Sequence, residues 1–374
     1  MLKNRFNLGS IIIFDLTIIG AGVIGLSIGK YFSQLGNSVL IIEKESRAGE
    51  GTSSRNSGVI HAGIYYPENS FKSRFCVEGN KMLYEYADEK NISHSKVGKY
   101  IVASQAGELN ALEKLFQQGI RNNVNLKYCS KQEIEEAIPQ IVCSSALFSP
   151  ETGIIDVPEF ITALEGDIQH KNGIVSFNTE FISAKKSKNF FEISCNDGTN
   201  FSIQSKTLVN ASGLSSDLIS YKIDQLDQRY IFPINFAKGH YFKYSAPNPF
   251  SSLVYPLADE FSLGIHVGFD LSGQLRFGPD LTWIDSIDFS FDESLKEKFI
   301  NAIHRYWPDM DPKKLHPDYV GIRPKIQNNN EGMQDFSILG PKEHGIEGLI
   351  NLQGIESPGV TSALAIGKYV SSLL

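Results

Sequence analysis

The chain has 374 residues, which at about 150 residues per domain predicts two domains. Hydrophobic residues make up 41% and charged residues 21%, an ordinary globular composition with ample material for a core. The 35 Lys and Arg against 42 Asp and Glu give a net charge of −7 without a basic block, so a nucleic acid is not an expected partner. Four scattered cysteines without CxxC spacing argue against a zinc site or disulfide scaffold and fit a reducing compartment.

An apolar run near the N-terminus has the sequence IIIFDLTIIGAGVIGLSIG and covers residues 11–29. It could be read as a signal peptide or a membrane helix, because Lys3 and Arg5 precede it. Against this, Asp15 would be costly inside a membrane, and the run has three regularly spaced glycines but no small-residue cleavage site. We therefore predict a buried strand, a glycine turn and a buried helix in a soluble, cytoplasmic protein.

The first predicted elements form a complete βαβ unit. A continuous apolar strand at 14–19 is followed by a helix over 26–35 and a second apolar strand at 38–42. Further along, apolar spacing predicts the remaining elements in chain order: a helix over 70–90, a strand at 99–104, a helix over 109–120, an extended segment at 146–155, a helix over 157–170, a meander of strands over 174–209, a strand-rich stretch over 229–291, a helix over 293–306, and a strand at 349–352 followed by a helix to about residue 370. No repeat or low-complexity linker interrupts the chain, so we expect the second domain to be inserted into the first.

The glycine turn after the first strand has the spacing of a dinucleotide-binding motif. Gly20 allows the tight turn, Gly22 lets backbone amides approach a pyrophosphate, and Gly25 lets the helix pack on the strand. Glu43 follows at the end of the second strand, where a carboxylate accepts hydrogen bonds from ribose hydroxyls. The strand, turn, helix and acidic residue together predict that this unit binds a dinucleotide.

The loop TSSRNSG at 52–58 is dense in hydroxyl and backbone donors. It could line a second stretch of an extended cofactor, or it could be an ordinary surface turn, and composition alone leaves both open.

A series of motifs resembles one known family. The sequence SSRNSGVIHAGIYY at 53–66, with FCVEGN at 75–80 behind it, is similar to that of the L-2-hydroxyglutarate dehydrogenase/oxidase family, within the FAD-dependent oxidoreductases of the D-amino-acid-oxidase superfamily. The resemblance extends over about 14–372 and includes NASG at 210–213, KGHYF at 238–242, VYP at 254–256, GIH at 264–266, GIRP at 321–324 and GIESPG at 354–359. The chain departs from some members at Lys238, where they have Arg, and at Ile355-Glu356, where they are rich in Ala.

The resemblance implies an α/β fold with two domains. A Rossmann-like FAD-binding domain would comprise 11–90, 146–225 and 320–374, and an inserted α+β substrate-binding domain with a mixed sheet would comprise 91–145 and 226–319. The implied activity is FAD-dependent oxidation of a 2-hydroxy acid, L-2-hydroxyglutarate to 2-oxoglutarate, with electrons passed to a quinone, another carrier or oxygen. The residues expected to contact a non-covalent FAD are Gly20, Ala21, Gly22, Val23, Ile24, Gly25, Glu43, Lys44, Thr52, Ser53, Ser54, Asn56, Ser57, Gly58, Val59, Ala211, Gly213, Gly354, Ser357, Gly359, Val360 and Thr361.

Oxidation of a hydroxy acid requires a hydride acceptor, a base for the hydroxyl proton and a cation for the carboxylate. His61 is the first candidate base, although it could instead pack against the flavin and bond to backbone. His266 is a second catalytic candidate, and His240 a substrate-binding one; either could equally be a core histidine.

Arg323 is the predicted carboxylate clamp, because a guanidinium pairs with a carboxylate through two parallel hydrogen bonds. A salt bridge between domains is its alternative role. Lys238 or Lys325 could bind a distal carboxylate, and Tyr65 and Tyr255 could donate hydroxyl hydrogen bonds to substrate. The helix that begins after Pro358-Gly359 could stabilise negative charge on the reduced flavin.

No grouping of residues has metal-ligand spacing, and no Gly-x-Ser-x-Gly elbow is present, so we expect neither a metal site nor a serine hydrolase. Two alternatives stay open: an amine or amino-acid oxidase of the same fold, and a non-catalytic FAD-binding protein. Peripheral association with the inner membrane stays open as well.

Overall fold

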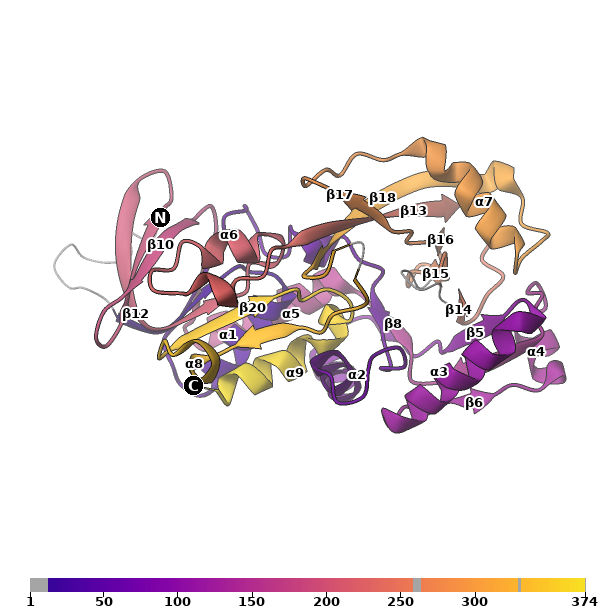
Figure 1. Cartoon of the computed structure of the whole chain (residues 1–374), viewed down its shortest axis with the longest axis horizontal. Helices are drawn as coiled ribbons and strands as arrows, with labels where there is room; N and C mark the ends of the chain where they lie inside the picture. The colour runs from indigo at the N-terminus through magenta and orange to yellow at the C-terminus, as the bar shows by residue number, and fades with distance from the viewer. Residues whose placement is uncertain (1–12, 258–263, 329–330, 374) are drawn as a thin grey trace.

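The computed structural model describes residues 13–257, 264–328 and 331–373, which form two large sheets and one small sheet (Figure 1). The predicted apolar run at 11–29 and the predicted strand-rich stretch at 229–291 each include a few residues outside these ranges. The first large sheet and its helices occupy one half of the elongated molecule, and the second large sheet occupies the other half.

The first sheet has eight strands with the order β10-β11-β12-β1-β2-β9, and β20 joins β12 while β19 joins β20. Its strands are β1 (Ile13–Ile19), β2 (Val39–Ile42), β9 (Ile174–Ser176), β10 (Glu180–Lys186), β11 (Phe191–Asn196), β12 (Asn200–Asn210), β19 (Ser337–Leu339) and β20 (Leu349–Gln353). β1 pairs in parallel with β12 and β2, so the predicted βαβ unit is confirmed and the membrane-helix interpretation of this segment is excluded.

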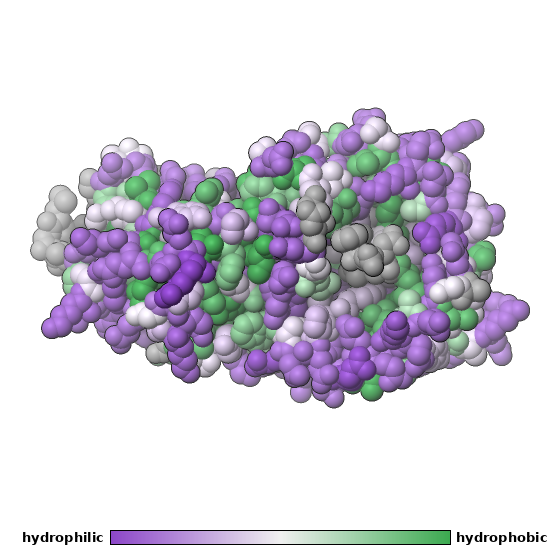
Figure 2. All heavy atoms as spheres, viewed as in Figure 1, coloured by the Kyte–Doolittle hydropathy of each residue, from purple (hydrophilic) through white to green (hydrophobic). Residues whose placement is uncertain are grey.

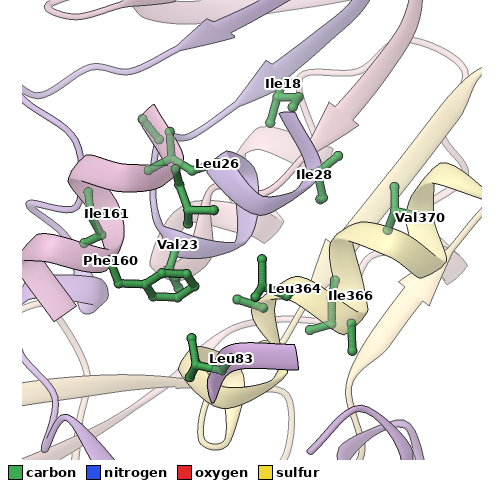
Figure 3. Packing of buried hydrophobic residues seen from close by; sticks show 14 of the residues in the cluster. Ile18, Val23, Leu26, Ile28, Leu83, Phe160, Ile161, Leu364, Ile366 and Val370 are labelled. Carbon is green, nitrogen blue, oxygen red and sulfur yellow. The ribbon is translucent and has the colours of Figure 1, made fainter. Parts of the chain in front are cut away.

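Four helices cover this sheet: α1 (Val23–Gln34), α2 (Phe71–Lys90), α5 (Val157–His170) and α9 (Gly359–Ser371). They share one hydrophobic core, in which Leu26, Phe160 and Leu364 are buried together with Leu83 (Figure 3). The four strand residues of β2 are all buried, as expected for a parallel strand covered on both faces. Two short helices, α6 (Ser216–Ser220) and α8 (Pro341–His344), complete this half.

The second sheet has nine strands with the order β17-β13-β16-β15-β14-β5-β7-β6, and β18 also pairs with β13. Its strands are β5 (Lys99–Ala103), β6 (Lys127–Tyr128), β7 (Ser145–Ser149), β13 (Asn235–Tyr244), β14 (Leu253–Pro256), β15 (Val267–Phe269), β16 (Leu275–Phe277), β17 (Thr282–Ile284) and β18 (Leu315–Lys325). β14 runs parallel to β5 while the other pairs are antiparallel, which confirms the predicted mixed sheet and the α/β class.

A separate core lies against the second sheet and contains Phe242, Phe299 and Trp307. The helices of this half are α3 (Leu109–Arg121), α4 (Lys131–Ala137) and α7 (Lys296–His304). The three-stranded sheet has the order β3-β8-β4, with β3 (Val59–Ile60), β4 (His94–Ser95) and β8 (Gly153–Ile155).

Several elements were not predicted, among them α4, β18 and the short elements β4, β6, β19 and α8. α4 begins at a capping box in which Ser130 accepts from the Glu133 amide and Glu133 accepts in return, a local signal that the sequence did contain. β18 is an 11-residue strand interrupted by two prolines, which weaken a strand signal. The predicted domain boundaries at 146 and 320 fall within β7 and β18, and both strands pair in the second sheet; the division into domains stays a prediction.

The face of the molecule shown in Figure 2 is mostly polar, with apolar side chains scattered among charged ones. Within the described ranges, every helix is either too short or too polar to cross a bilayer.

Candidate functional site

One cavity is lined by residues from both large sheets, and its space, including the opening to solvent, is about 2060 Å³. The wall contributed by the first sheet comes from the ends of β1, β2, β12 and β20. The opposite wall comes from β13, β14 and β18. The carboxyl ends of parallel strands are where α/β sheets bind ligands.

The glycine turn between β1 and α1 forms one end of the cavity. A Cβ on Gly20, whose φ is +103°, would lie 2.7 Å from the Ala211 carbonyl oxygen, and a Cβ on Gly25 would lie 2.0 Å from the Gly20 oxygen. The first turn of α1 contains no acidic residue, and Gly22 offers no capping side chain. Ser53 Oγ accepts from the Val23 amide at 3.1 Å, so a loop hydroxyl stands beside the helix N-terminus. These amides form an anion-binding site of the kind that holds a dinucleotide pyrophosphate.

Glu43 is fixed at the end of β2 by two backbone amides. Its Oε2 accepts from Ala21 at 2.7 Å and its Oε1 accepts from Glu45 at 2.9 Å. The carboxylate also lines the cavity and keeps lone pairs for ribose hydroxyls.

Most predicted cofactor residues line the cavity. They are Gly20, Gly22, Val23, Ile24, Glu43, Lys44, Thr52, Ser53, Asn56, Ser57, Val59, Ala211, Gly213, Gly354, Ser357, Gly359, Val360 and Thr361. Ala21, Gly25, Ser54 and Gly58 do not, although the Ala21 amide orients Glu43. The loop at 52–58 is therefore a cavity wall, which the sequence alone left open.

His61 follows β3 and lines the same cavity. Its Nε2 lies 3.4 Å from Ser357 Oγ, and its Nδ1 is buried with no hydrogen-bond partner among the described residues. Burial, reinforced by the charge of Lys99, lowers the pKa of His61 to about 3. The imidazole is therefore neutral near pH 7.

Two residues of the FCVEGN segment of α2, at 75–80, contact the backbone carbonyl of His61. Asn80 Nδ2 donates to the His61 carbonyl at 2.9 Å, and the Cys76 thiol lies 3.5 Å from the same oxygen. A Cβ on Gly79 would lie 2.2 Å from the Thr361 carbonyl oxygen, so α2 can approach α9 only where this residue is glycine. Thr361 Oγ1 in turn accepts from the His61 amide at 3.0 Å.

His266 and Tyr255 form a second group in the cavity wall. Their rings stack with centroids 3.5 Å apart and planes 10° apart. Behind Tyr255, the buried ammonium of Lys99 lies 4.6 Å from the Tyr255 ring centroid and 4.7 Å from that of Tyr65. Tyr65 does not line the cavity, and its buried hydroxyl has no partner among the described residues.

Arg323 lines the cavity from β18 and is held by carbonyl groups. Its Nη2 donates to the Asp280 carbonyl at 2.7 Å, while the Asp280 carboxylate accepts from the amide of His240 at 2.7 Å and approaches His240 Nδ1 at 2.9 Å. No carboxylate of the described chain forms a salt bridge with Arg323, so the predicted alternative of a bridge between domains is not observed in that part. Its charge is left for an anionic ligand.

Three other predicted residues lie outside the cavity wall. Lys238 is buried and bound to Asp288 at 2.9 Å, and His240 is buried against Asp280. Lys325 donates to Glu356 at 2.6 Å. A role for Lys238 or Lys325 with a distal carboxylate would require breaking these bonds. Among the described residues, no group of three or more acidic, His or Cys side chains could hold a metal ion.

The sequence analysis missed several cavity residues: Arg55, Tyr241, Phe289 and Glu356. Arg55 was quoted only as part of a motif, although an Arg inside a loop of small polar residues is a signal for an anion. Its Cζ lies 4.4 Å from the Phe289 ring centroid. Phe289 and Tyr241 carry no local signal, because an aromatic residue is more often a packing residue.

Comparison with known proteins gives a family and several relatives. The model of the FAD-dependent oxidoreductase family named DAO matches residues 15–373. A mitochondrial L-2-hydroxyglutarate dehydrogenase from Arabidopsis thaliana is 37% identical and aligns over 96% of this chain and 83% of its own length. A glycerol 3-phosphate dehydrogenase from Caloramator mitchellensis is 30% identical over 96% of this chain and 74% of its own.

Among solved structures, the FAD-bound, dithionite-reduced L-α-glycerophosphate oxidase from Mycoplasma pneumoniae superposes with a TM-score of 0.86. It is 24% identical, and the match covers 97% of this chain and 95% of the other, so the likeness concerns the fold.

Proposed function

Because this chain belongs to the DAO family of FAD-dependent oxidoreductases, we propose that it oxidises L-2-hydroxyglutarate to 2-oxoglutarate. The observation that carries the proposal is one cavity that a neutral histidine, His61, and the dinucleotide motif both line together with Arg323, which forms no salt bridge with a carboxylate of the described residues. The resemblance to the Arabidopsis dehydrogenase over 96% of the chain supports this substrate.

FAD is the cofactor of this family, and the residues of the cavity fit it. The α1 amides suit the pyrophosphate, Glu43 suits the adenosine ribose, and the loop 52–58 adds hydroxyl and amide donors along the wall. When bound, FAD supplies the electrophilic N5 atom that takes the α-hydrogen of the substrate as a hydride.

His61 is the base that takes the hydroxyl proton as the hydride leaves. The substrate then loses one hydride and one proton in total, which converts the secondary alcohol to a ketone. Ser357, 3.4 Å from Nε2, orients the ring, while the Asn80 and Thr361 contacts fix its backbone. The stacked rings of Tyr255 and His266 form part of the wall of the reacting space.

Arg323 binds the carboxylate next to the reacting carbon. Its guanidinium is pre-positioned by the Asp280 carbonyl, so little side-chain entropy is lost when the substrate binds. Arg55 lines the same cavity, and its backbone packs against Gly321, where a Cβ would lie 2.3 Å from the Arg55 oxygen. Arg55 and Arg323 therefore both line the cavity, and Arg55 is the proposed partner of the distal carboxylate of the five-carbon diacid.

Anaerobic flavin reduction tests the proposal directly. The purified yellow protein is mixed with L-2-hydroxyglutarate, D-2-hydroxyglutarate, L-lactate, glycerol 3-phosphate or several amino acids, and flavin absorbance near ~450 nm is followed. We expect rapid bleaching by L-2-hydroxyglutarate and slow or no bleaching by the others. Faster bleaching by glycerol 3-phosphate or an amino acid would reassign the substrate, and no bleaching by any of them would favour a non-catalytic FAD protein.

Two arginine variants test the carboxylate contacts. Arg323→Met should lower kcat/KM for L-2-hydroxyglutarate by about a hundredfold or more, because a charge-assisted bidentate pair is lost. Arg55→Met should lower kcat/KM for L-2-hydroxyglutarate more than for L-lactate, which lacks the distal carboxylate. The exposed Arg47→Met is the matched control and should leave both values unchanged.

The electron acceptor completes the reaction, and we propose a quinone or another carrier reached from a cytoplasmic or peripherally membrane-bound protein. Anaerobic reoxidation by a soluble quinone faster than aerobic reoxidation would support this acceptor. Rapid aerobic reoxidation with release of hydrogen peroxide would assign oxygen instead.

A further inference from the structure

A buried cluster of three charged residues adjoins the cavity and plays no part in the steps above. Glu356, in the loop that precedes α9, accepts through Oε1 from Lys72 Nζ at 2.9 Å and from Lys325 Nζ at 2.6 Å. Lys72 comes from the first turn of α2 and Lys325 from the end of β18. All three side chains are at least nine-tenths buried. We call Lys72, Glu356 and Lys325 the charge triad.

The triad carries an excess of positive charge. Two ammonium groups face one carboxylate, and neither lysine forms a salt bridge with a second acidic residue of the described chain. The pKa of Glu356 falls to about 2 although burial opposes its ionisation, because Lys72 and Lys325 stabilise the carboxylate. With both lysines protonated, the triad carries one net positive charge.

One more carboxylate lies close to the triad, and it is bound to other groups. Asp335 accepts from the Phe71 amide at 2.6 Å and the Lys72 amide at 2.9 Å, so it caps the N-terminus of α2. Lys72 Nζ itself lies 5.5 Å from the Phe336 ring centroid. On the other side, burial lowers the pKa of Lys325, Glu356 opposes this effect, and the nearby positive charge of Arg323 lowers the pKa further.

The triad adjoins the part of the cavity lined by three of the expected FAD contacts, Gly354, Ser357 and Gly359. Glu356 lines the cavity, and so do its neighbours Gly354, Ser357, Pro358 and Gly359 at the start of α9. The surroundings exclude water, so the effective dielectric constant is low and the charge is poorly screened. A fixed positive charge near the ring favours a flavin that has gained electrons.

We propose that the surplus charge of Lys72, Glu356 and Lys325 raises the electron affinity of the bound FAD, with Glu356 limiting the size of the effect. The triad residues are positioning residues that act through the field at the ring, and they touch neither substrate nor reacting atoms. The proposal rests on the FAD cofactor and not on the identity of the substrate.

A purely structural role for the triad makes a different prediction from an electrostatic one. Lys325→Met and Lys72→Met each lower the net charge of the triad from +1 to 0, whereas Glu356→Gln raises it to +2. An electrostatic effect therefore shifts the sulfite affinity and the midpoint potential of the flavin in opposite directions in the lysine and glutamate variants. A loop that has only lost its structural support should shift both quantities in the same direction in all three variants.

Sulfite binding to the oxidised holoenzyme measures the electrostatic effect of the triad on the flavin in the absence of substrate. Sulfite adds its sulfur lone pair to flavin N5 to form an N–S bond, and the electron pair displaced from the ring accumulates around N1 and the C2 oxygen. A nearby positive charge therefore favours the adduct. The dissociation constant is measured from the loss of flavin absorbance, and an equilibrium redox titration of the same samples gives the midpoint potential.

One unit charge at about 10 Å in a partly buried site changes an equilibrium constant about tenfold. We expect Lys325→Met to weaken sulfite binding by about tenfold and to lower the midpoint potential, and Lys72→Met to do the same. Glu356→Gln should tighten sulfite binding and raise the potential, while Lys325→Arg should stay near wild type. Lys30→Met, which changes a buried lysine on α1 outside the cavity, is the matched control and should have no effect.

The proposal is overturned if the lysine and glutamate variants shift sulfite affinity in the same direction, or if both lysine variants stay within twofold of wild type. Should Glu356→Gln fail to fold, Lys325→Met and Lys325→Arg decide, since only Lys325→Met removes the charge. Wild-type protein that binds FAD but is not reduced by L-2-hydroxyglutarate would refute the proposed function and leave this test unaffected.

Discussion

Two buried lysine sites border the same cavity and are stabilised in opposite ways. Lys72 and Lys325 share the carboxylate of Glu356, whereas Lys99 forms no salt bridge within the described chain and lies against the rings of Tyr65 and Tyr255. Burial lowers the pKa of Lys99 to about 7, with only Cys76 acting in the other direction. At Lys325 the Glu356 carboxylate opposes the effect of burial on the pKa, whereas Lys99 has only aromatic faces beside it and can lose its proton near neutrality.

The largest effect is expected from removing the shared carboxylate. Glu356→Leu leaves two buried ammonium groups without a partner, so the free energy of unfolding should fall by about 3–5 kcal/mol. Urea unfolding of the holoenzyme at pH 7 measures the change. A loss below about 1 kcal/mol would mean that the two lysines do not depend on this carboxylate for their charge.

Lys99 should instead make the free energy of unfolding depend on pH. Unfolded Lys99 keeps its proton up to about pH 10.5, whereas the folded residue loses it near pH 7, so this residue makes the native state more stable as the pH rises between these values. The slope is about 1.4 kcal/mol per pH unit, or about 3 kcal/mol between pH 7 and pH 9.

Lys99→Met removes that slope. The unfolding free energy of the variant should therefore exceed that of wild type by the largest amount at pH 7, and this excess should shrink toward pH 9. Chemical denaturation at both pH values checks it, and Lys81→Met, which changes an exposed lysine on α2, serves as the control. A difference that does not change with pH would show that Lys99 keeps its proton throughout.

A smaller effect is expected when one lysine of the charge triad is removed. Lys325→Met leaves a one-to-one pair of Lys72 and Glu356, so the free energy of unfolding should fall by only about 1–2 kcal/mol. The same urea titration as for Glu356→Leu gives the comparison. If Lys325→Met costs as much as Glu356→Leu, the triad acts as one unit in which no pair suffices.

The smallest effect should come from Tyr65→Phe. The Tyr65 hydroxyl is buried without a partner among the described residues, and the ring that faces Lys99 is retained, so the unfolding free energy should stay within about 1 kcal/mol of wild type. A loss of 2 kcal/mol or more would show that the hydroxyl binds a group, such as a water, that stabilises Lys99.

Local patterns in the sequence were enough to predict the first half of the site. The strand, the glycine turn, the helix and Glu43 lie within about 30 residues, and each can be predicted from the residues next to it in the sequence. The helix over 157–170 was predicted with the bounds that the structure shows, because its apolar spacing and its Asp156 cap are local signals. His61 and Arg323 were found through motifs, and the structure places them in one cavity.

The partners of the predicted residues could not be found in this way. Lys325 was considered for a distal carboxylate, and only the structure shows it bound to Glu356. Lys238 shows the same limit, since its partner Asp288 lies 50 residues further along the chain. A single sequence lists charges but does not say which of them meet.

The sequence by itself determined the βαβ unit, the dinucleotide motif and the residue types needed to oxidise a hydroxy acid, because each depends on residues close together in the chain. Only the tertiary structure decided which lysines are paired, which histidines line the cavity and that Arg323 forms no salt bridge within the described chain. Lys72, Lys325 and Glu356 come from α2, β18 and the loop before α9, and packing alone brings them to one oxygen atom. Burial then sets their charge, because the cost of desolvation depends on every element packed around them.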